Sequence, residues 1–145
     1  MDPQLKNVKT EDLKEGLIKT DDLDAFLSQN SDSFDETDAQ ELLRSLLERS
    51  GLSKAELARR SGVSEVYVHQ LFSGIRHPSR DRLICLALGM SVTLEEMQEL
   101  LRRLGHAELY AKEKRDAIII YGIAHGQTLQ ELNDNHFDRG AATLI

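Results

Sequence analysis

The sequence predicts an all-α fold in which a five-helix domain is followed by an extra helical hairpin. Apolar residues recur at three- and four-residue spacing in successive segments, as on one face of a helix. Ser, Thr or Asp precedes most of these segments, where such residues cap helices. The stretch from Ser53 to Ser73 also has the residue types of two short helices joined by a tight turn. Together these three observations predict helices throughout the domain and the hairpin.

Residues 1–37 are predicted to form an acidic, partly disordered arm. They contain 4 Lys against 10 Asp and Glu. Two short pieces have apolar residues at helical spacing among the acids, and the segment 30–37 is rich in Ser and Asp, which is typical of a linker. The arm is either a solvated tail or a segment that docks on a partner protein. The apolar positions are Leu13, Leu17 and Ile18 in the first piece and Leu23, Phe26 and Leu27 in the second.

The domain itself is predicted over residues 38–105, and its first helix over residues 39–50. Thr37 or Asp38 can cap this helix and Gly51 can end it. Four leucines at helical spacing form its buried stripe. They are Leu42, Leu43, Leu46 and Leu47.

The next two helices lie within the stretch 53–73. Ser53 can cap the first, and Glu56 three residues later completes a capping box. Gly62 follows, where the chain needs the left-handed conformation that only glycine adopts freely. Ser64 can then cap the second helix. The expected buried positions are Leu57, Ala58, Val68 and Leu71.

The fourth and fifth helices follow a loop that carries Arg76 and His77. Ser79 caps the fourth, residues 80–89, which is apolar nearly all round and therefore central. Its Cys85 is expected to be a small core residue. Thr93 and Glu96 make a second capping box, which starts a fifth helix that runs to Gly105.

Residues 106–145 are predicted to form a helical hairpin that repeats residues 80–109. Nine residues recur without a gap at an offset of 35. The expected helices are 115–125 and 129–139. The first of them begins with Arg115-Asp116, as residues 80–89 begin with Arg80-Asp81, and each Asp suits the positive end of the helix dipole. The identities are Arg80, Asp81, Ile84, Thr93, Leu94, Glu96, Gly105, Ala107 and Leu109 with Arg115, Asp116, Ile119, Thr128, Leu129, Glu131, Gly140, Ala142 and Leu144.

Composition excludes several classes of protein. One Cys allows neither a disulfide framework nor a cysteine zinc site, and none of the five His has the spacing of a helical metal site. There is no phosphate loop, so we expect no enzyme, no cofactor and no metal. No apolar run is long enough for a membrane span or a secretory leader, which predicts a cytoplasmic protein. The net charge of −7 lies mostly in the arm.

The stretch 53–73 resembles the helix-turn-helix of the Cro/CI-type (XRE, lambda-repressor-like) DNA-binding family, and the resemblance extends over about residues 38–105. It implies a five-helix domain whose third helix enters the DNA major groove. It also implies a transcriptional regulator, expected to be a repressor, that binds double-stranded DNA as a homodimer. The matching residues are Leu57, Ala58, Gly62, Val63, Ser64, Val68, Leu71, Gly74 and Pro78.

The resemblance also assigns candidate DNA contacts. Gln70 would pair with adenine, Glu65 would accept from a cytosine amine, and Val66 would contact a thymine methyl group. Three further residues would contact the phosphates of the DNA backbone. The base-reading positions are Ser64, Glu65, Val66, His69 and Gln70, and the backbone contacts are Lys54, Arg76 and His77.

The surface of the third helix also fits a second function. No Arg or Lys lies between Val63 and Gly74, and Glu65, Val66 and Tyr67 would give the exposed surface an acidic and apolar character. The alternative is therefore a protein-interaction module with weak or no DNA binding. A protein partner would bind through residues 1–37 or 106–145, and the copied hairpin is the candidate dimer surface. The arm could also fold over the DNA-binding face and inhibit it.

Overall fold

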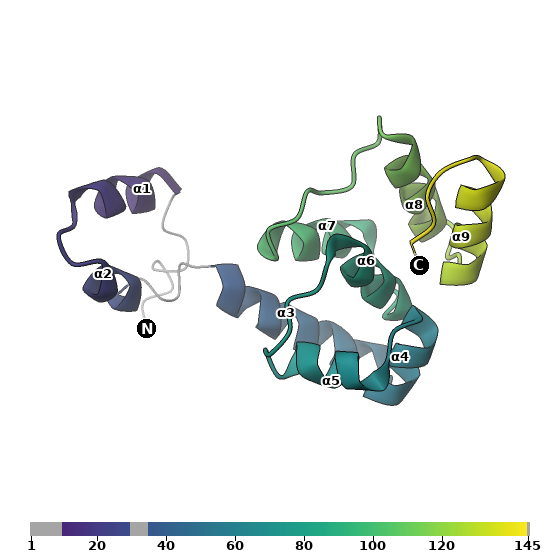
Figure 1. The fold of residues 1–145 in the computed structure, drawn as a ribbon, viewed down its shortest axis with the longest axis horizontal. Helices are drawn as coiled ribbons and strands as arrows, with labels where there is room; N and C mark the ends of the chain where they lie inside the picture. Colours follow the sequence, from purple (N-terminus) through teal and green to yellow (C-terminus); the bar gives the residue numbers. More distant parts are fainter. Residues whose placement is uncertain (1–9, 30–34, 145) are drawn as a thin grey trace. The chain divides into compact units, whose positions relative to one another are not determined.

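The computed structural model describes residues 10–29 and 35–144, and within these ranges every regular element is an α-helix (Figure 1). The all-α prediction is therefore confirmed. The chain divides into two compact units, residues 1–38 and 39–145. None of the helices in the described ranges is long and apolar enough to cross a membrane.

The first unit contains two short helices, α1 (Thr10–Lys19) and α2 (Leu23–Gln29). They approach closely at Gly16, where an added Cβ would lie 2.6 Å from the Phe26 ring. Ile18 remains 75% exposed and Leu23 57% exposed. Much of the apolar surface expected in these two pieces thus faces solvent. Residues 30–34 of the expected linker lie outside the described ranges.

The helix α3 (Asp35–Ser50) begins earlier than expected. Thr37 and Asp38 lie inside it, so the prediction that one of them caps the helix is wrong. The helix ends as predicted, because Gly51 takes a left-handed conformation with φ 71°. Leu43 and Leu46 of its stripe are buried in the core.

Helices α4 (Lys54–Ser61) and α5 (Glu65–Phe72) have the predicted boundaries. The Ser53 hydroxyl accepts a hydrogen bond from the Glu56 amide at 3.1 Å, and the Ser64 hydroxyl accepts one from the Tyr67 amide at 3.1 Å. Gly62 between them has φ 68°, as expected. Only the Ser53 half of the expected capping box is formed, whereas both halves form at Thr93 and Glu96.

Helix α6 (Arg80–Gly89) lies at the centre of the second unit (Figure 1). Five consecutive residues, 83–87, are completely buried, which confirms the prediction of a central helix. It packs against α4 and α7 (Leu94–Arg103). Gly89 permits the contact with α4, because an added Cβ would lie 2.6 Å from the Ser61 hydroxyl and 3.0 Å from Leu57.

Two more helices, α8 (Lys114–Ala124) and α9 (Leu129–Asp138), follow within the same compact unit. Thr128 and Glu131 form a complete capping box, like Thr93 and Glu96 thirty-five residues earlier. Gly105 and Gly140 end the two hairpins with φ 78° and 70°. Local geometry is therefore the same at these equivalent positions.

Candidate nucleic-acid interface

Helix α5 presents one face to the core and the other to solvent. Its buried face consists of Tyr67, Val68, Leu71 and Phe72. These residues fix the roll of the helix about its axis, because their spacing matches a single helix face. The left-handed Gly62 and the Ser64 cap set the angle at which α5 leaves α4. Every residue that points away from the core on α5 is thereby held in a defined direction.

The sequence-predicted reading positions lie on or near the outward face. Ser64, Glu65, Val66 and His69 are exposed, and Val66 is 65% exposed. Gln70 is half-buried at the edge of that face. The His69 ring nitrogen Nε2 lies 3.4 Å from a Glu65 carboxylate oxygen, one helical turn away. The surface is thus polar, with Glu65 as its formal charge and Val66 as its single apolar side chain.

Tyr67 contradicts the expectation that it contributes to this surface. Only 6% of it is exposed, because it belongs to the core-facing side of α5. Its ring instead supports two cations. The guanidinium of Arg76 lies 5.0 Å from the ring centroid and that of Arg82 lies 4.8 Å away. Such cation–π contacts hold an arginine in place while leaving its outer edge free to bind an anion.

Arg82 is a residue that the sequence reasoning missed. It is exposed in the first turn of α6, and nothing in its sequence context separates it from an ordinary surface arginine. Its relation to α5 depends on how α6 packs, so no local spacing could have indicated it. With Arg76 it gives the neighbourhood of α5 the positive charge that α5 itself lacks.

The loop 74–78 is tied to the end of α5. The Gln70 carbonyl accepts hydrogen bonds from the Ile75 amide at 3.0 Å and the Arg76 amide at 3.3 Å. The Gln70 side-chain oxygen also accepts one from Arg76 Nε at 3.0 Å. An amide oxygen has two acceptor sites, so Gln70 keeps one of them together with its NH₂ group. Arg76 therefore orients the Gln70 side chain and leaves it able to make further hydrogen bonds.

The other end of this loop, at Pro78, is held by His106. His106 Nε2 lies 2.9 Å from the carbonyl oxygen of Pro78, where a protonated nitrogen donates to the carbonyl. The His106 ring also contacts that of His77, with centroids 5.6 Å apart. His77 itself is exposed. The loop thus presents Arg76 and His77 from a backbone anchored at both ends.

Lys54 lies at the start of α4, half-exposed, with its ammonium 6.0 Å from the centroid of the Phe72 ring. Phe72 belongs to the last turn of α5, so this contact connects the two helices. The predicted backbone contacts Lys54, Arg76 and His77 are all accessible to solvent.

The Cys85 thiol and the potential metal ligands do not form a second candidate site in the described residues. Cys85 is completely buried, and burial raises the pKa of its thiol to about 12. A thiol of this kind is protonated at neutral pH and cannot act as a nucleophile. Across the described parts of the chain, no group of three His, Cys, Asp or Glu side chains is placed to hold a metal ion.

Comparison with known families finds a match over residues 43–97, to the family described as Helix-turn-helix. The matched range begins inside α3, contains α4, α5 and α6, and ends within α7. Neither the comparison with curated proteins nor that with solved structures returned a match.

Proposed function

We propose, on the premise that residues 43–97 form an XRE (Cro/CI-type) helix-turn-helix domain, that this DNA-binding regulator is a sequence-specific repressor. The observation that carries the proposal is the fixed outward face of α5 beside the two arginines on Tyr67. Helices of this motif place the outward face of the second helix in the major groove. A protein that occupies a duplex in this way excludes other proteins from it.

Sequence would be read by side chains of α5. Gln70 would pair with an adenine through its remaining acceptor site and its NH₂ group. Glu65 would accept from a cytosine amine, and Val66 would contact a thymine methyl group. Ser64 and His69 flank them on the exposed surface. A guanine contact by arginine is not part of this set, because α5 contains neither Arg nor Lys.

Affinity would come from contacts to the phosphate backbone. Lys54, Arg76 and His77 are the candidates already expected, and Arg82 joins them because it shares the Tyr67 ring with Arg76. Each phosphate neutralised by a cation releases counterions, so affinity falls as salt concentration rises. The expected salt dependence is modest, since only a few cations are available.

The test is duplex selection with the full chain, followed by titration of the selected duplex at several salt concentrations. Gln70→Ala should lose about 1–3 kcal/mol on the selected site and relax one base position. Lys54→Ala should weaken all duplexes alike and reduce the salt slope by about one. Lys112→Ala, an exposed lysine between α7 and α8, serves as the control and should change neither. Failure to bind any duplex at low salt would remove the proposal.

A second candidate is a protein-interaction module on the same fold. It is favoured by two exposed apolar side chains near α5, Val66 at 65% and Ile75 at 78% exposure. The titrations above separate the two functions, because an interaction module gives no salt-dependent duplex binding. The acidic arm at residues 1–37 stays a candidate segment for such a partner.

The homodimer expected from the resemblance stays a prediction. It requires a pairing surface, and the hairpin expected to provide one packs against α6 and α7 of its own chain. A homodimer of the full chain would therefore have to release that hairpin or use another surface.

A further inference from the structure

Two reciprocal ion pairs join the α6–α7 hairpin to the α8–α9 hairpin. Arg80 makes a bidentate pair with Asp116, with hydrogen bonds of 2.9 and 3.3 Å. Arg115 makes the same pair with Asp81, at 2.8 and 2.9 Å. Arg115 and Asp116 are the residues that follow Arg80 and Asp81 at the offset of 35. The arginine of each hairpin thus binds the aspartate of the other.

Each arginine also binds the segment that follows its own hairpin. Arg80 donates to the carbonyls of Ala107 and Glu108 at 3.0 and 3.3 Å. Arg115 donates to the carbonyls of Ala142 and Thr143 at 2.8 and 2.9 Å, the equivalent positions. The two guanidinium groups therefore have equivalent sets of partners, which a chance pair of surface charges would not have.

The backbone hydrogen bonds of Leu109 and Leu144 follow a similar pattern. Leu109 is clamped by Gln98, which donates to its carbonyl at 2.9 Å and accepts from its amide at 2.7 Å. The amide of Leu144 donates to Asn133 at 2.9 Å, again at equivalent positions. Both leucines are 5% exposed. Helix α6 contacts α9 while α7 contacts α8, which is the exchange that a two-fold axis produces.

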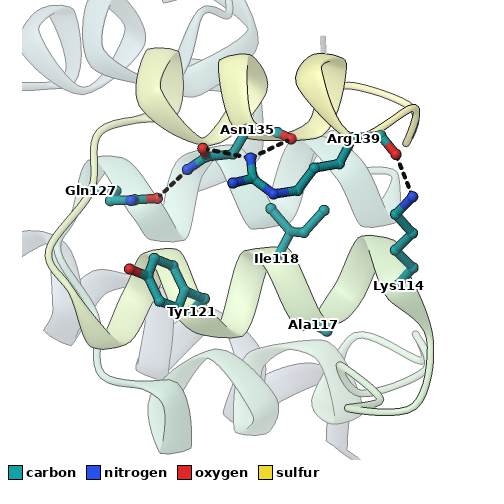
Figure 2. A pocket seen from close by; sticks show the side chains of 7 residues that line it. All are labelled: Lys114, Ala117, Ile118, Tyr121, Gln127, Asn135 and Arg139. Atoms are coloured by element: carbon teal, nitrogen blue, oxygen red, sulfur yellow. Dashed lines mark hydrogen bonds between the residues drawn. The ribbon is translucent and has the colours of Figure 1, made fainter.

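The outer faces of the two hairpins differ. In the first, Leu86 and Leu100 are completely buried within the core that also includes residues of α3, α4 and α5. The equivalent residues of the second are Tyr121, which is exposed, and Asn135. They line an open cavity of about 490 Å³ (Figure 2). Within residues 39–144, no counterpart of α3–α5 covers this face.

Polar side chains on the outer face of the α8–α9 hairpin form hydrogen bonds with one another. Asn135 donates to Gln127 at 3.1 Å and accepts from Arg139 at 3.0 Å, and Lys114 donates to the Arg139 carbonyl, as Figure 2 shows. Gln127 and Arg139 stand where the first hairpin has the buried Val92 and Leu104. At these four positions the second hairpin thus loses apolar core residues of the first, while it keeps the residues of the two-fold contact.

We propose that the α8–α9 hairpin takes, within one chain, the place that the α6–α7 hairpin of a second copy would take. The α6–α7 surface would be self-complementary, since Arg80 of one copy would meet Asp81 of another and the reverse. A short connection, residues 104–113, holds the hairpin at an effective concentration of roughly millimolar, so pairing within the chain outcompetes a second copy at micromolar concentration. The full chain is then a monomer that carries one helix-turn-helix. The monomeric state does not depend on the proposed function, whereas the number of DNA half-sites that one molecule binds rests on it.

The test compares the same substitution at two equivalent positions of the full chain. Asp116→Arg places two arginines together within the chain but leaves the surface on α6 and α7 intact, so it should convert the monomer to a dimer in sedimentation. Asp81→Arg damages both the pairing within the chain and the pairing between copies, so it should stay a monomer. Circular dichroism checks the helix content of both. If either variant fails to fold, Asp116→Asn and Asp81→Asn provide the same comparison with a smaller shift in association.

A wild-type chain that sediments as a dimer at micromolar concentration would overturn the proposal. So would equal masses for the two variants, since the hairpins would then not be equivalent. These measurements use no DNA and keep their meaning if the chain binds none. If it does bind, the wild type should protect one half-site per molecule, and a pair of symmetric half-sites should give no cooperativity.

Discussion

The guanidinium of Arg82 lies 4.8 Å from the centroid of the Tyr67 ring, which joins the first turn of α6 to the buried face of α5. Arg76 lies 5.0 Å from the same centroid. One aromatic side chain therefore positions two cations beside a helix that has none of its own. The positive charge next to α5 therefore comes from Arg76 and Arg82, which lie outside this helix, and the Tyr67 ring of α5 positions both of them.

Two substitutions of Tyr67 should distinguish the contribution of its ring to duplex affinity from that of its hydroxyl. Tyr67→Phe keeps the ring and should bind the selected duplex like the wild type. Tyr67→Leu removes the ring and should weaken binding about two- to five-fold for each arginine, since an exposed cation–π contact contributes about 0.5–1 kcal/mol. Titration of a labelled duplex measures both variants, and thermal unfolding identifies any general loss of structure. Equal affinity for the two variants would show that the ring does not organise the arginines.

Local sequence signals were sufficient for most of the fold. Ser53, Ser64, Ser79 and Thr93 all cap the helices expected of them, because a cap depends on residues within one turn. The start of α3 was placed wrongly because Asp35 to Asp38 are acceptable inside the first turns of a helix as well as before it.

Contacts between distant residues could not be predicted in the same way. Tyr67 was expected on the surface but lies on the core-facing side of α5, and its contact with Arg82, fifteen residues away on another helix, depends on how α6 packs. The Arg80 and Asp81 pair was interpreted as a helix start, which is correct locally. The offset of 35 indicated that Arg115 and Asp116 repeat this pair, but not that the two pairs bind each other. A repeat in sequence contains no information on how its copies pack.

Ser91 and Gly126 offer a test of backbone strain at equivalent positions. Both follow the first helix of a hairpin in the left-handed region, with φ 55° and 64°. This conformation costs a residue with a Cβ roughly 1–2 kcal/mol, and glycine loses part of this advantage through its freedom in the unfolded state. Ser91→Gly should therefore raise the free energy of unfolding by about 0.5–1 kcal/mol, measured by urea denaturation.

The reverse substitution, Gly126→Ser, should lower the free energy of unfolding by a similar amount. An added Cβ at Gly126 meets no atom within 4 Å, so the change acts through the backbone alone. If both substitutions shift the urea midpoint in the same direction, left-handed strain does not explain the difference between the two turns.

Cys85 should report on global unfolding. Its side chain is completely buried in α6, and burial raises the pKa of its thiol to about 12. Alkylation by iodoacetamide at pH 8 should be undetectable in the native protein and rapid in urea, because both access and ionisation require unfolding. Mass spectrometry measures the modification, with Cys85→Ala as the control for other sites. Rapid labelling of the native chain would mean that α6 opens locally.

The pairing of Arg49 with Glu96 should make stability depend on acid. Arg49 donates two hydrogen bonds to the Glu96 carboxylate, one of them 2.8 Å long, and this contact lowers the pKa of Glu96 to about 2. A carboxyl whose pKa is lowered by folding stabilises the protein above its unfolded pKa, and this contribution is lost as pH falls through the folded value. The relevant window therefore runs from about pH 4.5 down to about pH 2.

Glu96→Gln should lower the melting temperature by a few degrees at pH 7, and the difference from the wild type should shrink across that window. Glu131→Gln is the matched control, because Glu131 forms the same capping box with Thr128 and makes no arginine contact in the described part of the chain. Subtracting the effect of the control removes the contribution of the cap itself. What remains measures the link from α3 to α7, which is also screened by salt since Arg49 is half-exposed. A difference that is independent of pH would assign the effect to the capping box instead of the ion pair.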